Sequence, residues 1–366
     1  MNIVFDKKEF AEAVGITARF SERRTATLPV LSAIIVVAGD DGIKLRATNL
    51  ETGIDMALRG TIRSPGVVAL PAHILKDIAL SFSGTGALSF EHVGDTVTFS
   101  SGTAKSVAKT VPYEDFPTIP LPESSAVRLT LPGALLRDAI GAVVSCASSS
   151  SVRPELASVL LLASGGKIKA VATDSFRLAE KQISLEKGIP AFTALIPAKN
   201  ASEIAATIPE NEVTVSFDEH QGSFSWDGST LSTRLTAAQY PDYAQIIPKS
   251  FTAEATVLRK DFEAALRRAA VFSDAFQKVR LSFEIKGKRI TISSRNTDTG
   301  ESVESVPASV SGDPLELPFN HRYLQAPLPL ISAESIKISA AGIGRPLLIR
   351  GAGDASFLYL VMPMNQ

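Results

Sequence analysis

The stretch K-I-K-A-V-A-T-D-S-F-R-L, from Lys167 to Leu178, is an alternating apolar segment that ends in a polar corner. Alternation over this length is typical of a half-buried β-strand. Directly after it, the side chain of Asp174 can accept hydrogen bonds from backbone N–H groups two residues further on. The same Thr-Asp-Ser run, with Arg177 close behind, also has the residue types of a catalytic loop. A corner that recurs elsewhere in the chain favours the structural interpretation.

Two other segments repeat this corner. G-I-K-L-R-A-T-N-L-E-T-G covers Gly42 to Gly53, and R-I-T-I-S-S-R-N-T-D-T-G covers Arg289 to Gly300. The polar corner residues Asn49, Asp174 and Asn296 recur about every 120 residues, the size of a whole small domain. The residues at the corner differ between the copies: T-N-L, T-D-S and R-N-T. A catalytic triplet copied three times would therefore explain the recurrence poorly. We predict a strand-end turn at each corner, in which the Asn or Asp side chain bonds the backbone.

Two helical patterns keep the same spacing. In the first, apolar residues recur at helical intervals around Phe10, Leu136 and Phe262. In the second, a short helix is predicted to begin at a proline, which loses no needed hydrogen bond there; the prolines are Pro71, Pro197 and Pro318. β-rich segments that break at Gly and Asp follow each second helix. The chain is therefore predicted to hold three copies of one α+β domain.

The predicted domain boundaries are 1–122, 123–250 and 251–366. The joins fall in two segments rich in Pro and Ser, Pro117 to Ser125 and Ile246 to Ala253, as is usual for linkers. In the third copy, Pro327 and Pro329 are predicted to end or kink the second helix early.

The composition is that of an ordinary globular protein. The 366 residues are 45% hydrophobic and 20% charged, with a formal net charge of −1. This balance gives no global attraction to nucleic acid or acidic membranes, so any attraction requires charges sorted onto one face. Cys146 is the only cysteine, which favours a reducing compartment. The sequence has no signal peptide, transit peptide or long apolar run, so we expect a cytoplasmic location.

No pattern of catalytic or metal-binding residues stands out in the sequence. No H-E-x-x-H or C-x-x-C motif occurs, and the four histidines stand far apart: His73, His92, His220 and His321. Cys146 lies in an apolar helix end and is interpreted as a small core residue. We therefore expect a scaffold or binding protein without cofactor or enzymatic activity. The alternatives are a multi-domain hydrolase with a site assembled between domains, and a β-rich adhesion protein, which the missing secretion signal argues against.

Five short motifs carry a family resemblance. They are T-L-P-V-L-S (Thr27 to Ser32), A-T-D-S-F-R-L-A, Y-P-D-Y-A-Q-I-I-P-K (Tyr240 to Lys249), V-R-L-S (Val279 to Ser282) and Y-L-V-M-P-M-N-Q (Tyr359 to Gln366). In this order and spacing they resemble the bacterial β sliding clamps, the processivity subunits of DNA polymerase III. The resemblance implies three clamp-type domains per chain, with antiparallel sheets outside and helices lining the hole of a homodimeric ring. Such a ring encircles double-stranded DNA independently of sequence and tethers the replicative polymerase, raising its effective concentration.

The resemblance also implies residues that contact DNA. A sliding ring needs weak, salt-sensitive contacts to the phosphate backbone. Arg24 matches a DNA-contacting loop of the family, and Arg23, Arg137 and Lys199 are expected to contact DNA with it. Further helix cations are expected to face the hole: Lys7, Lys8, Arg19, Arg259, Lys260, Arg267 and Arg268. In a second DNA-contacting loop, Ser149 to Glu155, the chain has Pro154 and Glu155 where the family often has aromatic residues. We expect less base stacking there.

A pocket between the second and third domains is implied to accept short, extended, Leu- and Phe-rich peptides. These belong to the polymerase III α subunit, the clamp loader δ subunit, other DNA polymerases and repair proteins. The matching positions are Leu156, Thr173, Ser175, Phe176, Arg177, Leu178, Pro241, Ile246, Pro346, Val361, Met362, Pro363 and Met364. Flexible Met suits several ligands, and the prolines keep the rim stiff. The family often has Arg near Gln245 and a basic residue near Asn365, and this chain has neither.

Ring closure is implied to join two chains head to tail. Val271 and Phe272 match the family's apolar pair at the end of the fifth helix. They are expected to pack on an edge strand of the partner that aligns with Lys105 to Val111. Because Ser106 and Ala108 stand there in place of bulkier side chains, we expect a weaker dimer than the family norm.

Overall fold

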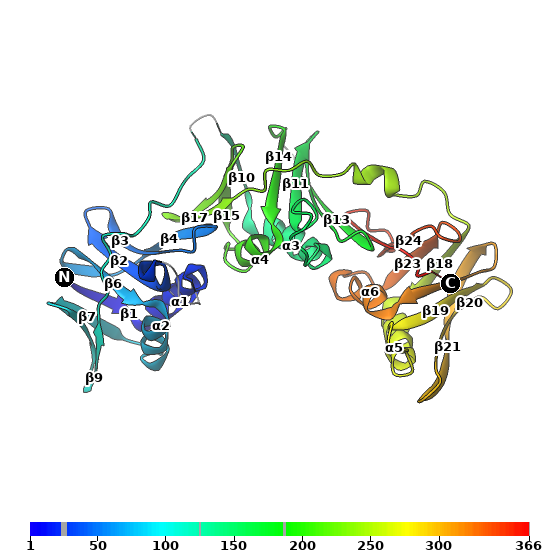
Figure 1. The fold of residues 1–366 in the computed structure, drawn as a ribbon, viewed down its shortest axis with the longest axis horizontal. Coiled ribbons are helices and arrows are strands. Elements are labelled where there is room, and N and C mark those ends of the chain that lie inside the picture. The colour runs from blue at the N-terminus through cyan, green and yellow to red at the C-terminus, as the bar shows by residue number, and fades with distance from the viewer. Residues whose placement is uncertain (23–27, 124–125, 186–187, 366) are drawn as a thin grey trace. The chain divides into compact units, whose positions relative to one another are not determined.

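The computed structural model describes residues 1–22, 28–123, 126–185 and 188–365 of the chain. The chain divides into two compact units, and Figure 1 labels the helices and strands that form them. Unit 1 comprises Met1–Arg137 and Lys199–Ala237, and unit 2 comprises Asp138–Ala198 and Ala238–Gln366. Both units consist mainly of antiparallel sheet with a few short helices, which confirms the predicted α+β class.

Unit 1 holds two antiparallel sheets. The first has five strands in the order β5 (Thr61–Ser64), β1 (Asn2–Asp6), β7 (Ala87–Val93), β8 (Thr96–Ser101) and β9 (Ala104–Lys109). The second has eight, in the order β10 (Val127–Pro132), β15 (Glu212–Phe217), β16 (Gln221–Trp226), β17 (Ser229–Arg234), β4 (Thr52–Leu58), β3 (Gly42–Thr48), β2 (Ala33–Gly39) and β6 (Gly66–Pro71). β9 is an edge strand, because it pairs with β8 alone.

Unit 2 is built on one sheet of twelve strands. Their order is β14 (Phe192–Pro197), β11 (Ser158–Ser164), β12 (Lys167–Thr173), β13 (Arg177–Ser184), β25 (Phe357–Val361), β24 (Leu347–Gly351), β23 (Ser335–Ala340), β18 (Ala253–Leu258), β21 (Gly300–Gly312), β20 (Arg289–Asn296), β19 (Lys278–Glu284) and β22 (Leu315–Asn320). The long strand β21 pairs with β20 through its first part and with β18 through its last part.

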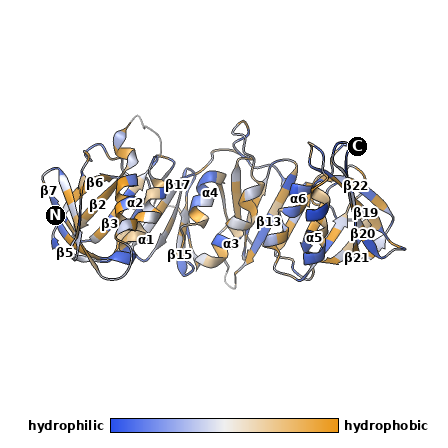
Figure 2. Cartoon of the chain, turned by 90° about the horizontal axis from the view of Figure 1, so that it is seen from below, coloured by the Kyte–Doolittle hydropathy of each residue, from blue (hydrophilic) through white to orange (hydrophobic). Residues whose placement is uncertain are grey.

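The longer helices begin each copy of the repeat, as the sequence predicts. They are α1 (Lys7–Thr17), α3 (Gly133–Val143) and α5 (Arg259–Ala270), and the landmark side chains Phe10, Leu136 and Phe262 are buried beneath them. In Figure 2, α1 lies over strands of unit 1 and α5 over strands of unit 2. Asp6 caps α1 by accepting hydrogen bonds from the backbone of Lys8 and Glu9. None of the helices in the described ranges is long and apolar enough to span a membrane.

The predicted strand-end turns occur in all three copies. Asn49 Oδ1 accepts from the backbone N–H of Thr52 at 2.8 Å, and Asp174 Oδ1 accepts from that of Phe176 at 2.9 Å. Asn296 Oδ1 accepts from the N–H of Asp298 at 2.9 Å. The side-chain oxygen replaces a backbone acceptor at the point where each strand must turn. The corner is therefore a structural unit of the repeat.

The second helices differ from the prediction at their starts. Pro71 and Pro197 are the last residues of β6 and β14, and α2 (Ala72–Ser81) and α4 (Ala198–Ala205) begin one residue later. In the third copy, Pro318 lies inside β22, and α6 (His321–Gln325) begins after Asn320, whose side chain caps it. The prediction of a proline within the first turn was wrong, because Pro71 and Pro197 end edge strands and Pro318 lies within one. α6 does end at Gln325, before Pro327, as predicted.

Strand pairing joins parts of the chain that lie far apart in sequence. In unit 1, β17 pairs with β4, so that Leu231 lies opposite Ile54. In unit 2, β13 pairs with β25, so that Leu178 lies opposite Leu360. Each pairing continues one sheet from one copy of the repeat into the next. The two compact units therefore divide the chain within its middle copy.

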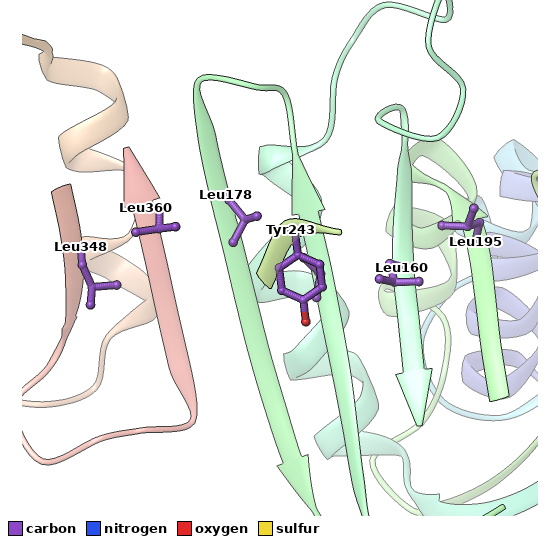
Figure 3. Packing of buried hydrophobic residues seen from close by; sticks show 7 residues of the cluster. Leu160, Leu178, Leu195, Tyr243, Leu348 and Leu360 are labelled. Carbon is purple, nitrogen blue, oxygen red and sulfur yellow. The ribbon is translucent and has the colours of Figure 1, made fainter. Parts of the chain in front are cut away.

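A buried apolar cluster packs against the β13–β25 pairing in unit 2 (Figure 3). Leu178 and Leu360 contribute from the paired strands, and Tyr243 covers them from the short helix η4 (Tyr243–Ile246). The remaining buried members are Leu160, Val171, Leu195 and Leu348. Burying aliphatic side chains of this size stabilises a fold by about 1.5–3 kcal/mol each. This cluster fixes the base of the corner around Asp174.

Candidate functional site

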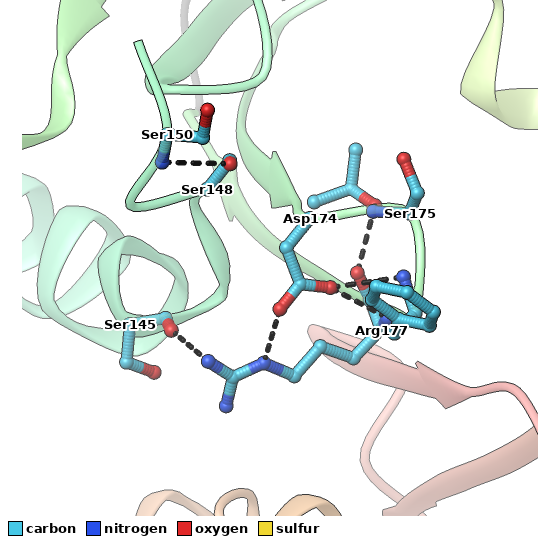
Figure 4. A network of polar contacts seen from close by, with 8 residues as sticks. Ser145, Ser148, Ser150, Asp174, Ser175 and Arg177 are labelled. Atoms are coloured by element: carbon cyan, nitrogen blue, oxygen red, sulfur yellow. Dashed lines mark hydrogen bonds and ion pairs between the residues drawn. The ribbon is translucent and has the colours of Figure 1, made fainter. Parts of the chain in front are cut away.

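The corner between β12 and β13 is held by side-chain to backbone hydrogen bonds (Figure 4). Asp174 Oδ1 accepts from the backbone N–H groups of Phe176 and Arg177, both at 2.9 Å. The hydroxyl of Thr173 donates to the carbonyl of Arg177 at 2.7 Å. Ser175 has a φ of 76°, in the left-handed region. Because the corner is fixed in this way, the side chain of Phe176 projects from it and is 61% exposed.

Arg177 ties the corner to two other elements. Its Nε donates to Asp174 Oδ2 at 2.9 Å, and an Nη donates to the carbonyl of Ser145 at 2.6 Å. Its guanidinium carbon also lies 4.7 Å from the ring centroid of Tyr323 on α6, a cation–π distance. Burial acts to lower the pKa of Arg177, but the hydrogen bond to Asp174 and nearby groups raise that pKa above its ordinary value. The side chain is thus a permanent cation that positions the corner.

An apolar cavity of about 360 Å³ lies beside the corner. We call it the corner cavity, and its lining residues are Thr173, Ser175, Phe176, Arg177, Leu178, Ile246, Pro346, Leu360 and Met362. Eight of the positions predicted from the sequence are in this lining, and Leu360 is an addition. Leu360 was missed because only the β13–β25 pairing brings it opposite Leu178.

A second cavity of about 620 Å³ adjoins the C-terminal segment. We call it the tail cavity, and it is lined by Phe176, Phe276, Lys278, Asn320, Tyr323, Met362, Pro363, Met364 and Asn365. The C-terminal segment is held in place because Met362 N–H donates to Phe176 O and Met364 N–H donates to Pro318 O, both at 2.8 Å. Phe176 and Met362 line both cavities, so the two are neighbours along one surface.

Apart from Asn365, which the sequence analysis names only as a flanking position, four tail-cavity residues were missing from the predicted pocket positions: Phe276, Lys278, Asn320 and Tyr323. They come from the segment before β19, from β19, from the end of β22 and from α6. In the sequence, Asp274 was the one residue that could have indicated this part of the cavity, because it resembles the polar corner residues. Its Oδ1 accepts from the N–H groups of Phe276 and Lys278, both at 3.0 Å, and so fixes another exposed phenylalanine.

Three predicted pocket positions lie outside both cavity linings. Leu156 and Val361 are buried in the core, and Pro241 is exposed on the surface. Val361 alternates with Met362 along the end of β25, so its side chain points to the opposite side. Packing within the unit covers Leu156 and Val361 in this structure, and their assignment to the pocket stays a prediction.

The lining suits a ligand that is largely apolar. Both cavities present aliphatic, aromatic and methionine side chains with a few polar groups, the usual composition of a binding site. Cys146 is fully buried, and burial raises the pKa of its thiol to about 11, which leaves it protonated. This agrees with its interpretation as a small core residue. In the parts of the chain that the structure describes, no group of three or more His, Cys, Asp or Glu side chains is arranged for a metal ion.

The predicted DNA-contacting cations fall into two groups. Arg23 and Arg24 lie outside the described residues. Arg137 forms an ion pair with Glu210 at 2.9 Å, whereas Lys199 has no ion pair with any residue in the described ranges. Of the other helix cations, four have acidic partners: Lys8 with Glu12, Arg19 with Glu203, Arg267 with Glu263 and Arg268 with Glu304. In the second loop, Glu155 pairs with Arg153.

The residues predicted for ring closure differ in exposure. Val271, directly after α5, is 71% exposed, and Phe272 is half-buried with its ring near Gly300. On β9, Ser106 is half-buried and Ala108 is buried. Val107, between them, is 57% exposed. Ala108 therefore offers little surface to a partner, and Val107 is the apolar group that β9 presents.

Substitutions at Asp174 should separate its two roles. Asp174→Asn keeps an acceptor for the turn and loses the ion pair, so we expect a loss of about 1–2 kcal/mol in unfolding free energy. Asp174→Ala also leaves the mostly buried Arg177 without a counter-ion, and should cost about 3–4 kcal/mol. Urea unfolding measures both. Asn49→Ala, at the matching corner without an ion pair, is the control. If Asn49→Ala and Asp174→Ala lowered the unfolding free energy equally, the ion pair between Asp174 and Arg177 would add nothing to stability.

Comparison with known proteins gives one consistent result. Models of the DNA polymerase III beta subunit match the chain in three parts: the N-terminal domain over residues 1–120, the central domain over 130–242 and the C-terminal domain over 244–365. A beta sliding clamp from Synechococcus elongatus is 27% identical over 374 residues, covering 100% of this chain and 99% of that protein.

Solved structures agree with the sequence matches. The crystal structure of the DNA polymerase sliding clamp from Bacillus subtilis has 26% identity and a TM-score of 0.91, covering 100% of this chain and 99% of that one. The crystal structure of the beta subunit from the DNA polymerase of Streptococcus pyogenes has 25% identity and a TM-score of 0.92, covering 100% of both chains.

Proposed function

Because this chain belongs to the DNA polymerase III beta subunit family, we propose that two copies of it close into a ring around duplex DNA. The chain is a DNA sliding clamp for the replicative polymerase and not an enzyme, which answers the hydrolase alternative. A ring holds its DNA by topology, so the tethered polymerase stays at high effective concentration without tight contacts to the DNA. The proposed location is the cytoplasm, and the proposed domains are 1–122, 123–250 and 251–366.

The corner and tail cavities are the proposed docking site for partners. One observation carries this proposal: two neighbouring apolar cavities share Phe176 and Met362, and Phe176 is mostly exposed. An extended peptide can place one apolar side chain in each cavity and cross between them over Phe176. The polymerase III α subunit, the clamp loader δ subunit, other DNA polymerases and repair proteins would present such short peptides. Sharing one site among several partners suits the flexible methionines of the lining.

Ring closure is proposed to use the edge strand β9 of one copy and the region around Val271 of the other. β9 leaves one backbone edge unpaired, which makes it able to add a strand from a partner. Lys105 and Lys109 are exposed on β9, while Glu301 and the exposed Val303 lie on the first part of β21. Opposite charges and apolar residues on the two surfaces favour a head-to-tail contact between copies.

DNA contact is proposed to begin with lysines that lack acidic partners. Lys7, Lys199 and Lys260 form no ion pair with other residues in the described ranges, so their charges are available to phosphates. Arg137 is half-buried and its partner Glu210 is exposed, so their ion pair is weak and Arg137 can exchange the carboxylate for a phosphate. Arg23 and Arg24 remain in the proposed set. Contacts of this kind depend on salt and carry no sequence information.

Retention on circular DNA tests the proposed function directly. The wild-type protein, loaded onto nicked plasmid by a clamp loader and ATP, should co-elute with the plasmid on gel filtration. A restriction enzyme that cuts the plasmid should release it, because a ring slides off a free end. Plasmid cut before loading is the control. Equal retention on circular and cut DNA would contradict the ring and indicate ordinary surface binding.

A further inference from the structure

The tail cavity contains one charged side chain in an otherwise neutral lining. Lys278 stands among aromatic, methionine, proline and asparagine side chains. Its backbone N–H donates to Asp274 Oδ1 at 3.0 Å, which fixes the residue at the start of β19. Across the β19–β22 pairing it lies opposite Asn320, another lining residue. The lysine is therefore built into the wall of the cavity by backbone contacts.

The ammonium group of Lys278 has no carboxylate partner within 4 Å among the residues that the structure describes. The neighbouring cations are already paired: Arg177 with Asp174 at 2.9 Å, and Arg280 with Glu316 at 3.0 Å. Lys278 is half-buried, so part of its hydration is replaced by the cavity wall. An unpaired ammonium at an apolar surface attracts an anionic group more strongly than one in open water.

We propose that Lys278 makes the tail cavity selective for peptides that carry a carboxylate next to the apolar residue seated there. The inference rests on the proposed docking function and adds a chemical preference to it. An apolar or aromatic ligand side chain would pack against Phe276 and Met364, and its carboxylate would accept a charge-assisted hydrogen bond from Lys278. The amide of Asn320 can donate to the second carboxylate oxygen.

A carboxylate can come from an Asp or Glu side chain or from a free C-terminus of the partner. Lysine offers a compact point charge and does not require the planar, two-point geometry that arginine favours. Both sources therefore satisfy Lys278, and the position of the carboxylate along the peptide decides which one is used. The chain has neutral Gln245 and Asn365 in the same region, so no other cation of the tail-cavity lining duplicates the role of Lys278.

Peptide binding to the full-length protein tests this selectivity. Three fluorescein-labelled, Leu- and Phe-rich peptides are compared by fluorescence anisotropy: a neutral one with an amidated C-terminus, the same one with Glu beside the Phe, and the neutral one with a free C-terminus. We expect at least one carboxylate peptide to bind about three- to tenfold more tightly than the neutral one, as for a partly exposed ion pair. High salt should reduce this preference.

Substitutions of Lys278 test whether this lysine causes the preference for a carboxylate peptide. Lys278→Gln should remove the preference for a carboxylate peptide over the neutral one, Lys278→Glu should reverse it, and Lys278→Arg should keep most of it. Lys286→Gln, on the exposed turn at the far end of β19, makes the same change in net charge and should keep the preference. An unchanged preference in Lys278→Gln, or none in the wild type, overturns the inference. Failure of every peptide to bind the wild type would instead contradict the docking function itself.

Discussion

The Val271→Asp variant should be a monomer that no longer stays on circular DNA. Val271 is among the most exposed apolar side chains in unit 2, and its proposed role is to be covered by β9 of the partner. Placing an unpaired carboxylate in an apolar contact costs about 2–5 kcal/mol, or roughly 30-fold or more in affinity. A two-fold ring contains the contact twice, so one substitution weakens both interfaces. Sedimentation velocity at micromolar concentration measures the loss.

Two comparisons keep this result specific. Val152→Asp changes an 87% exposed valine of the same unit and should leave the dimer intact. The Val271→Asp monomer should also bind the Leu- and Phe-rich peptide as the wild type does, because Val271 lies in neither cavity lining. A dimer that persists with Val271→Asp would rule out this contact. The wild-type dimer should itself dissociate measurably in this range, since Ser106 and Ala108 offer little apolar bulk.

The Phe176→Ala variant should lose most of its affinity for partner peptides. Phe176 lines both cavities, and an exposed aromatic at the centre of a binding surface is the residue type whose truncation costs 2 kcal/mol or more, about 30-fold in affinity. The corner should survive the substitution, because its bonds use the backbone N–H and carbonyl of Phe176 and the side chain of Asp174. Anisotropy titration and thermal unfolding measure the two effects separately.

Graded variants identify how each cavity contributes to this loss. Phe276→Ala affects the tail cavity alone and should reduce peptide affinity by less than Phe176→Ala does. Leu80→Ala removes an exposed leucine from α2 in unit 1 and should change nothing. If Phe176→Ala bound the peptide within twofold of the wild type, the shared surface would not be the docking site. A loss of folding in that variant would show up as a lower unfolding temperature.

Local chemistry explains the features that could be predicted from residues alone. The three strand-end turns depend on hydrogen bonds between residues fewer than four positions apart, at Asn49, Asp174 and Asn296. Donor and acceptor therefore lie in the same short stretch of sequence. Phe10 and Phe262 are buried because helical periodicity places apolar residues on one face. Pro318 shows the limit of such reasoning, since the same residue type can end a strand or begin a helix depending on what pairs beside it.

The ion pairs of Arg19 and Arg268 could not be predicted from the sequence, because each joins residues far apart in the chain. Arg19 pairs with Glu203 at 2.8 Å, and the two are separated by most of unit 1 in sequence. Arg268 pairs with Glu304 from β21. A count of basic residues on the helices therefore overstates the charge available to DNA. Lys199 and Lys260 become the stronger candidates only once the ion pairs of the described residues are known.

The sequence by itself determined the threefold repeat, the α+β class and the corner at Asp174, because these follow from short-range periodicity and turn chemistry. Most of the corner-cavity lining was implied by the family resemblance and not by these patterns. Only the tertiary structure decided that Val361 is core while Met362 lines two cavities, and that Phe276 and Lys278 belong to the same surface as Phe176. The β13–β25 pairing and the bond from Met364 to Pro318 bring these residues together. Long-range backbone pairing sets which side of a strand is covered, and no local pattern contains that information.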